Sequence, residues 1–119
     1  MLQAVAHCHK HNVIHRDIKL ENFVINKVAN EKKLIVKLID FGISAIYDES
    51  NPPSTKCGTI YTVAPEVLKN PSYDSRIDIW SLGIILFEML TLDIPFNGDT
   101  LAEVQKQILF TEIDYSSYS

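Results

Sequence analysis

The most apolar stretch of the sequence, DIWSLGIILFEMLTL, occupies residues 78–92 and constrains the fold more than any other part of the chain. Apolar side chains fall on nearly every side of a helix with this sequence, a pattern typical of a helix buried on most sides. The stretch contains Asp78 and Glu88 and is too short and too charged to span a bilayer. We therefore expect a central buried helix that needs neighbouring elements around it.

The N-terminal residues 1–10 show helical spacing, and Asn12 is a suitable stop signal. The face predicted to pack inward consists of Leu2, Val5, Ala6 and His9. His7 and His11 lie one turn apart on this helix, as zinc ligands often do. No third ligand follows at a suitable spacing, so we expect no zinc site.

Two more helices are predicted in the second half of the chain. Residues 64–69 begin a short helix, which ends near Asn70-Pro71 because proline cannot continue it. Residues 100–109 form an amphipathic pattern, with Thr100 as candidate N-cap and Glu103 three residues later. This pair is the signature of a capping box, in which each side chain bonds the other residue's backbone N–H.

The β-rich runs 23–25 and 34–39 are separated by the polar sequence NKVANEKK, which predicts a hairpin. Residues 40–61 are rich in Gly, Ser, Thr and Pro and are predicted to form a long loop. Long loops in compact domains are usually functional or disordered. The predicted fold class is mainly α (α+β), with one small hairpin.

Composition excludes several classes of protein. Hydrophobic residues make up 46% of the 119 and charged residues 22%, an ordinary globular balance for one domain. The net charge is −4 without a dense Lys/Arg run, so we expect no nucleic acid partner. Residues 1–14 are too polar for a signal peptide, and we expect no membrane partner. Cys8 and Cys57 are then expected to be free thiols in a reducing, cytoplasmic compartment.

Polar groups suited to phosphoryl transfer lie in the two loops beside the predicted hairpin. Asp17 can orient a hydroxyl and accept its proton, and Lys19 can offset the charge of a transferred phosphoryl group. Asn22 and Asp40 offer the oxygen ligands that Mg²⁺ prefers. Antiparallel pairing of the hairpin should bring these two residues together, because they flank its two strands.

These residues carry a resemblance to a known family. His15-Arg16-Asp17-Ile18-Lys19-Leu20-Glu21-Asn22 resembles the catalytic loop of protein kinases. Asp40-Phe41-Gly42 resembles their magnesium-binding motif, and Ala64-Pro65-Glu66 the motif that closes their activation segment. Asp78-Ile79-Trp80-Ser81-Leu82-Gly83 resembles the start of their central buried helix. We name residues 15–22 the catalytic loop and residues 40–66 the activation segment.

The resemblance implies a role for each matching residue. Asp17 would be the catalytic base, and Lys19 would contact the transferred phosphate of ATP. Asn22 and Asp40 would bind Mg²⁺ and, through it, the nucleotide. Thr59 would lie near Asp17 and Lys19 and help to seat the substrate.

The remaining roles concern substrate choice, regulation and structure. Glu21 matches a position that often contacts a basic residue of the substrate, and Arg16 would meet a phosphorylated residue such as Thr55. The residues implied as structural are His15, near the backbone of the Asp40 loop, Glu66 and Asp78, which would hold the catalytic-loop backbone. Asp78 could otherwise be a plain N-cap.

The motifs also refine the class. Lys19 and Gly58-Thr59 resemble serine/threonine kinases, and CGTIYTVAPEVL and IPFNGDTLAEVQKQI are most similar to calcium/calmodulin-dependent and calcium-dependent protein kinases. Thr62 departs from them, since tyrosine is usual there. The implied function is transfer of the ATP γ-phosphate to a serine or threonine hydroxyl of a protein substrate. A small-molecule phosphotransferase is disfavoured, because Ala64-Pro65-Glu66 and Gly58-Thr59 serve protein substrates in the family.

The resemblance covers only part of a kinase domain. Residues 1–119 match the stretch from the catalytic loop to the helix after the central one, within the C-terminal lobe. The glycine-rich loop and lysine of the N-lobe, and the last C-lobe helices with the arginine partner of Glu66, are not matched. We therefore expect this chain alone to have little or no kinase activity. The alternative function is a non-catalytic interaction module derived from a kinase.

Overall fold

The computed structural model describes residues 1–27, 34–69, 72–113 and 115–116. The described elements, in chain order, are α1 (Leu2–Lys10), β1 (Val13–Ile14), the 3₁₀ turn η1 (Leu20–Asn22), β2 (Phe23–Lys27), β3 (Leu34–Leu38), β4 (Ala45–Ile46), α2 (Pro65–Lys69), α3 (Arg76–Thr91) and α4 (Leu101–Phe110). Helices predominate over strands in this part of the chain, as predicted. None of the described helices is long and apolar enough to cross a membrane.

The predicted hairpin is confirmed. Strands β2 and β3 pair antiparallel, with Phe23 opposite Leu38 and Lys27 opposite Leu34. The predicted connection covered residues 26–33, but β2 continues through Asn26 and Lys27. The rest of the connection, residues 28–33, lies outside the described residues. This register brings the chain just before β2 next to the chain just after β3, where the candidate metal ligands lie.

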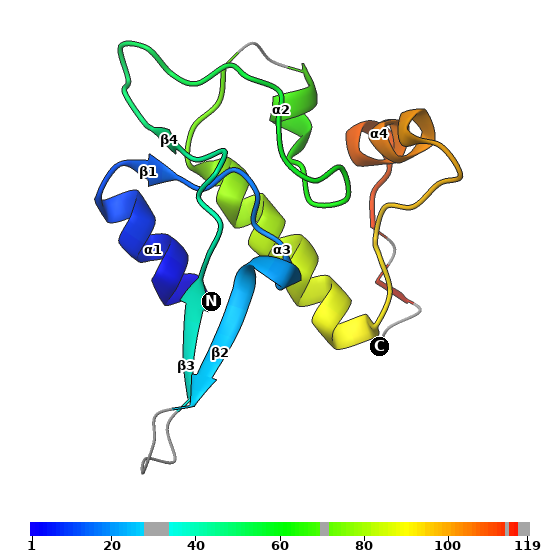
Figure 1. Cartoon of the computed structure of the whole chain (residues 1–119). Coiled ribbons are helices and arrows are strands. Elements are labelled where there is room, and N and C mark those ends of the chain that lie inside the picture. The colour runs from blue at the N-terminus through cyan, green and yellow to red at the C-terminus, as the bar shows by residue number, and fades with distance from the viewer. Residues whose placement is uncertain (28–33, 70–71, 114, 117–119) are drawn as a thin grey trace.

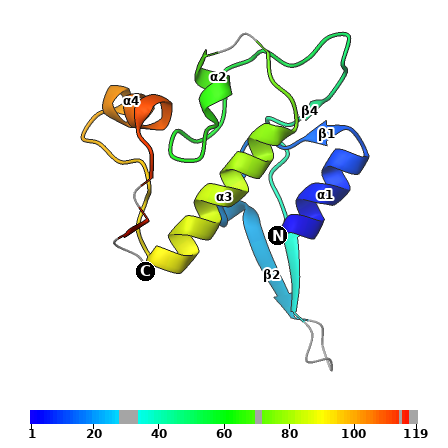
Figure 2. The ribbon, with the colours of Figure 1, turned by 180° about the vertical axis from the view of Figure 1, so that it is seen from behind.

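Helix α3 lies between the other elements. Figure 1 and Figure 2 show α1 on one side of α3 and α4 on the other, with the hairpin projecting away. Ile77 and Ile84 of α3 belong to a core cluster shared with α2, α4 and the segments before them. Ile85, on a different side of the helix, packs in a second cluster with Val5 of α1 and Ile18 of the catalytic loop. The helix therefore joins two small cores.

The prediction that α3 is buried on most sides is wrong for the described structure. Its buried residues are Ile77, Asp78, Ser81, Ile84 and Ile85. Leu86 is 57% exposed and Leu90 is 76% exposed, because no described element covers that side. Sequence periodicity reports how apolar each side of a helix is, and it cannot report which neighbours are present.

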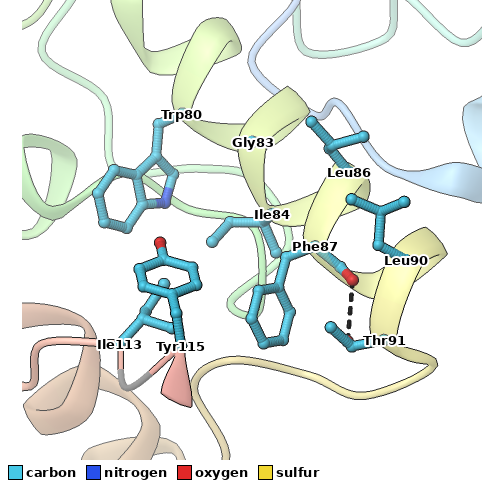
Figure 3. Close-up of a pocket in the computed structure, with 9 residues that line it drawn as sticks. All are labelled: Trp80, Gly83, Ile84, Leu86, Phe87, Leu90, Thr91, Ile113 and Tyr115. Carbon is cyan, nitrogen blue, oxygen red and sulfur yellow. Dashed lines mark hydrogen bonds between the residues drawn. The ribbon is translucent and has the colours of Figure 1, made fainter. Parts of the chain in front are cut away.

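The uncovered side of α3 opens into an apolar pocket of about 750 Å³. Figure 3 shows Trp80, Phe87 and Tyr115 converging on it, and the rings of Phe87 and Tyr115 meet edge to face at 6.4 Å. The ring of Trp80 stacks on Phe96 with centroids 5.9 Å apart. Its Nε1 is buried without a hydrogen-bond partner among the described residues. This apolar pocket is thus distinct from the loops that carry the polar groups.

The shape of the molecule accounts for this exposure. Its principal extents are 48 × 43 × 22 Å and its radius of gyration is 15.6 Å. A compact domain of this length has a radius of gyration of about 13–14 Å. The shortest extent equals roughly two helix diameters of about 10–12 Å each. The chain is therefore more spread out than a compact domain of its length, and one side of α3 is left uncovered.

Other local predictions have mixed outcomes. Helix α1 buries Val5 and Cys8, whereas Leu2 and Ala6, which were predicted to pack inward, are exposed. Asn12 follows the helix with a left-handed φ of 57°, in agreement with the predicted stop. The pairing of β1 with β4 was not predicted, because strands of two residues are too short to show alternation.

The C-terminal helix and the short helix are confirmed. The Thr100 side chain accepts from the Glu103 N–H, and the Glu103 carboxylate accepts from the Thr100 N–H, so the predicted capping box is complete. Helix α2 begins at Pro65, one residue later than predicted. The predicted stop of this helix at Asn70-Pro71 lies outside the described residues.

The burial pattern of α3 can be tested with two truncations on one helix. Replacing the buried Ile85 by alanine should lower the free energy of unfolding by about 2–5 kcal/mol, since it leaves a cavity between α1 and α3. Replacing the exposed Leu90 by alanine should change it by less than about 0.5 kcal/mol. Urea denaturation of both variants measures the difference. Equal losses would show that α3 is buried all round, as the sequence pattern alone predicts.

Candidate active site

The backbone of the catalytic loop is held by a buried carboxylate on α3. Asp78 is 1% exposed, and its Oδ2 and Oδ1 accept from the backbone N–H groups of His15 and Arg16, both at 2.9 Å. His9 of α1 contacts the same Oδ2 through Nε2 at 2.8 Å. Arg16 has a left-handed φ of 69°, which is uncommon for a residue with a side chain. The bonds to Asp78 hold the loop in this conformation.

His15 connects the catalytic loop to the end of the hairpin. Its side chain is fully buried, and Nε2 donates to the carbonyl of Ile39 at 2.9 Å. Nδ1 then accepts from the backbone N–H of Asp17 at 3.3 Å. The ring of Phe41 packs against the imidazole edge with centroids 4.8 Å apart. His15 therefore links the residue before Asp40 to the residue that carries the candidate base.

The carboxylate of Asp17 is the centre of a polar cluster. Its Oδ1 accepts from the hydroxyl of Thr59 at 2.7 Å and from the Thr59 backbone N–H at 3.1 Å. Its Oδ2 lies 2.9 Å from Nζ of Lys19, which also donates to the Thr59 hydroxyl at 3.1 Å. The structure brings these three predicted site residues together in one hydrogen-bonded triangle.

The cluster changes the acidity of its members. Burial opposes ionisation of the Asp17 carboxyl, but hydrogen bonds from Lys19 and Thr59 outweigh it and hold the pKa of Asp17 below its usual value. The bond to Asp17 raises the pKa of the Lys19 ammonium, and the charges of Glu21 and Asp40 act in the same direction. Both groups are therefore charged near neutral pH.

Asn22 and Asp40 lie at the same end of the hairpin. The N–H of Ile39 donates to the carbonyl of Asn22 at 2.9 Å, which places the start of β2 beside the end of β3. The Asn22 amide donates to the carbonyl and the carboxylate of Asp17 at 2.8 and 3.3 Å. Asp40 is exposed and accepts from the Gly42 N–H at 3.2 Å.

The oxygens of these two residues fit a hard cation. The amide nitrogen of Asn22 is engaged by Asp17, so its carbonyl oxygen is left to face another partner. A side chain at Gly42 would lie 3.1 Å from Oδ1 of Asp40, so glycine keeps this carboxylate uncrowded. Among the described residues, no three His, Cys, Asp or Glu side chains gather as a metal site. A cation held by Asn22 and Asp40 would need its other ligands from phosphate and water.

Arg16 reaches the activation segment without touching Thr55 directly. Its Nε donates to the carbonyl of Ile43, and Nη2 lies 3.5 Å from the carbonyl of Ser44. Its Nη1 donates to the hydroxyl of Tyr73 at 3.1 Å, and that hydroxyl donates to the carbonyl of Thr55 at 2.6 Å. Tyr73 was not identified from the sequence, because it lies outside every motif.

A small pocket of about 220 Å³ adjoins the polar cluster. Lys19 and Thr59 line it together with two carboxylates, Glu21 of the catalytic loop and Glu88 of α3. Glu88 was noted in the sequence only as a charge within the apolar helix. Its proximity to Glu21 depends on the contact between α3 and the catalytic loop, which the sequence does not show.

Two other residues complete the site. Thr62, which departs from the family pattern, is buried, and its carbonyl accepts from the Ser81 hydroxyl at 2.7 Å. Its own hydroxyl donates to the carbonyl of Thr59 at 3.3 Å, so it helps to tie the Thr59 turn to α3. Glu66 is partly buried, and the ion pairs of the described residues do not include it.

Comparison with known proteins agrees with the motifs. Residues 1–117 match the protein kinase domain family, and the chain belongs to that family. It is 40% identical over 108 residues to calcium-dependent protein kinase 4 of Plasmodium berghei, covering 91% of this chain. It is also 40% identical over 115 residues to a probable myosin light chain kinase of Dictyostelium discoideum, covering 97% of this chain. A probable serine/threonine-protein kinase of Enterocytozoon bieneusi, a KIN1 homolog, is 40% identical over 109 residues.

The relatives are much longer than this chain. The aligned region makes up 20% of the Plasmodium kinase, 18% of the Enterocytozoon kinase and 29% of the Dictyostelium kinase. The family inferred from the four motifs is confirmed, as is the similarity to calcium-dependent protein kinases.

Because Asp78 holds the backbone of the catalytic loop, removing its negative charge should lower the free energy of unfolding considerably. Replacing Asp78 by asparagine should lower the free energy of unfolding by about 3–5 kcal/mol, because an amide cannot accept from all three donors. Replacing Asp74 by asparagine, whose oxygen can still accept from the Arg76 N–H, should cost less than about 1 kcal/mol, because the ion pair with Arg76 is mostly exposed. Urea denaturation compares the two, and equal midpoints would contradict the role of Asp78.

The acidity of Asp17 can be measured directly. Its carboxyl should titrate below the usual value of about 3.9, and replacing Lys19 by methionine should raise the midpoint. Since the folded pKa is the lower one, ionised Asp17 stabilises the fold above about pH 3.9. This stabilisation is lost as the pH falls through the folded pKa. Carbon-13 NMR of the Asp17 carboxyl gives both midpoints, and identical values would show that Lys19 does not stabilise the carboxylate.

Proposed function

We propose that the chain is the phosphoryl-transfer part of a serine/threonine protein kinase domain, which moves the γ-phosphate of ATP to a serine or threonine hydroxyl of a protein. One observation carries the proposal. The Asp17 carboxylate is bonded to Lys19 and Thr59 while Asn22 binds the Asp17 backbone beside the hairpin end that carries Asp40. Phosphoryl transfer relies mainly on positioning and charge, and this cluster supplies both.

Asp17 is suited to orienting the acceptor hydroxyl. A carboxylate with a lowered pKa is a weak base, so it takes the proton as the bond to phosphorus forms rather than before. Lys19 already lies against Asp17 and Thr59, and its ammonium can offset negative charge on a transferred phosphoryl group. Thr59 holds the carboxylate from the activation segment and so couples that segment to the reaction.

Asn22 and Asp40 are the residues we assign to the metal and nucleotide. Their oxygens are of the type Mg²⁺ prefers, and the hairpin keeps them at one edge of the cluster. When bound, Mg²⁺ would neutralise charge on the phosphates of ATP. The two residues would then fix the direction from which the phosphates approach Asp17.

The small pocket beside the cluster supports a preference for basic protein substrates. Glu21 and Glu88 line it, and no described ion pair engages either carboxylate. A lysine or arginine of the substrate near the acceptor hydroxyl would offset both charges. The kinase names of the relatives agree with a serine/threonine acceptor but do not state this preference.

Regulation and the extent of the domain are also part of the proposal. Arg16 is bonded to the activation segment at Ile43 and is linked to the Thr55 carbonyl through the Tyr73 hydroxyl, so a phosphate on Thr55 would find a cationic partner nearby. Residues 1–119 would be an incomplete catalytic domain, and ATP would need contacts that these residues do not provide. The free thiols of Cys8 and Cys57 suit a reducing, cytoplasmic setting.

A phosphoryl-transfer assay tests the function. The longest natural polypeptide that contains these residues should phosphorylate a basic serine or threonine peptide at about 1–100 s⁻¹ with Mg²⁺ and ATP. Replacing Asp17 by asparagine should lower kcat by about 10²–10⁴-fold, because the hydroxyl loses its base. Replacing Asp99, an exposed residue outside the cluster, is the matched control.

The 119-residue chain alone should turn over far more slowly, because it does not position ATP. Transfer at a rate near the kinase range by this chain would contradict that expectation. An unchanged kcat after Asp17→Asn would refute the assigned base. Binding of the peptide without any transfer, in the long polypeptide as well, would favour the interaction module.

A further inference from the structure

A buried tyrosine outside the motifs joins the catalytic loop to the activation segment. Tyr73 lies just before α3 and is 6% exposed. Its hydroxyl lies 3.1 Å from Nη1 of Arg16, 2.6 Å from the carbonyl of Thr55 and 3.8 Å from Sγ of Cys57. Its backbone N–H donates to the carbonyl of Pro53 at 3.1 Å. One residue therefore contacts three positions of the activation segment and one of the catalytic loop.

The direction of each hydrogen bond follows from chemistry. A guanidinium can only donate, so the phenol oxygen accepts from Arg16. The single phenol proton is then free to go to the carbonyl of Thr55, which can only accept. Burial raises the pKa of Tyr73 against the opposing effect of Arg16, which keeps the phenol protonated for this role. Both bonds can form at once and make a continuous chain from Arg16 to Thr55.

The activation segment passes very close to Arg16 at this place. A side chain at Gly58 would lie 2.6 Å from the carbonyl oxygen of Arg16, and Gly58 has a φ of 100°. The next residue, Thr59, is hydrogen-bonded to both Asp17 and Lys19 of the cluster. The position of Thr59 on Asp17 thus depends on how residues 55–58 are held against the catalytic loop.

We propose that Tyr73 is a positioning residue that holds the activation segment against the catalytic loop, so that Thr59 stays on Asp17 without a phosphate on Thr55. The role of Tyr73 in catalysis depends on the proposed kinase function, whereas its hydrogen bonds to the two segments are a property of the fold. Arg16 secures the start of the segment at Ile43, and Tyr73 secures its middle at Thr55.

The two native thiols allow a test within the chain. Cys57 is partly buried against the Tyr73 hydroxyl, and Cys8 is buried in α1. Burial raises the pKa of the Cys8 thiol, and the charge of Asp78 adds to the effect, so Cys8 is a slow internal reference. Replacing Tyr73 by phenylalanine keeps the ring and removes the hydroxyl. Alkylation of Cys57 by N-ethylmaleimide should become roughly tenfold faster, with Cys8 unchanged, because only the segment is released.

Hydrogen exchange gives a second readout that does not depend on thiol chemistry. In the Tyr73→Phe protein, amides of residues 48–59 should exchange roughly tenfold faster, while those of residues 76–91 should keep their rates. Tyr61→Phe, which removes an exposed hydroxyl from the same segment, is the matched control and should change neither. Neither readout needs phosphoryl transfer, so an inactive chain does not affect the result.

A second variant covers the case in which the first one unfolds. Arg16→Gln leaves the tyrosine ring packed and should also speed alkylation of Cys57. The two changes should not be additive, because both remove the bond between Arg16 and the Tyr73 hydroxyl, although Arg16→Gln also removes bonds to Ile43 and Ser44. An equal increase in the alkylation rates of Cys8 and Cys57 would show that Tyr73 only supports the core, and it would overturn the proposal. An unchanged alkylation rate of Cys57, together with unchanged hydrogen exchange over residues 48–59, would overturn it as well.

Discussion

The buried carboxylate of Asp78 is the interaction on which the other parts of the site depend. A buried charge is costly unless it is fully hydrogen-bonded, and Asp78 has three donors from two different elements. Its place in the first turn of α3 adds the favourable helix dipole. The bonds fix a left-handed residue, Arg16, directly before the candidate base. A loop of this kind would relax to ordinary backbone angles if the carboxylate were absent.

From this anchor, the site is assembled from separate stretches of the chain. His15 links the catalytic loop to the end of β3, and Thr59 links it to the activation segment. Asn22 bonds the backbone of Asp17 from the start of the hairpin. His15 and Asn22 bond backbone carbonyls, and Thr59 bonds the Asp17 carboxylate itself, which leaves little freedom for that carboxylate. Such rigidity is what a reaction governed by orientation requires.

Much of this arrangement could be predicted from the sequence where the signal is local. The capping box at Thr100 and the antiparallel hairpin follow from residue types within a few positions. The exposure of Leu90 could not be predicted, since it depends on which neighbours surround α3. Tyr73 and Glu88 also carried no local signal, because their partners lie far away in the sequence. Family motifs identified the residues of the polar cluster, but only the structure shows how the bonds are shared among them.

The hydrogen bonds already made to the Asp17 carboxylate limit how an acceptor hydroxyl can bond to it. A carboxylate has about four acceptor positions, and two donors from Thr59, one from Lys19 and one from Asn22 use them. An acceptor hydroxyl that donates to Asp17 must therefore displace one of these donors. The bond from the Asn22 amide is the longest at 3.3 Å, so it is lost at the least cost. The remaining bonds to Lys19 and Thr59 keep the carboxylate in place, and the hydroxyl becomes part of the same network from which its proton will be taken.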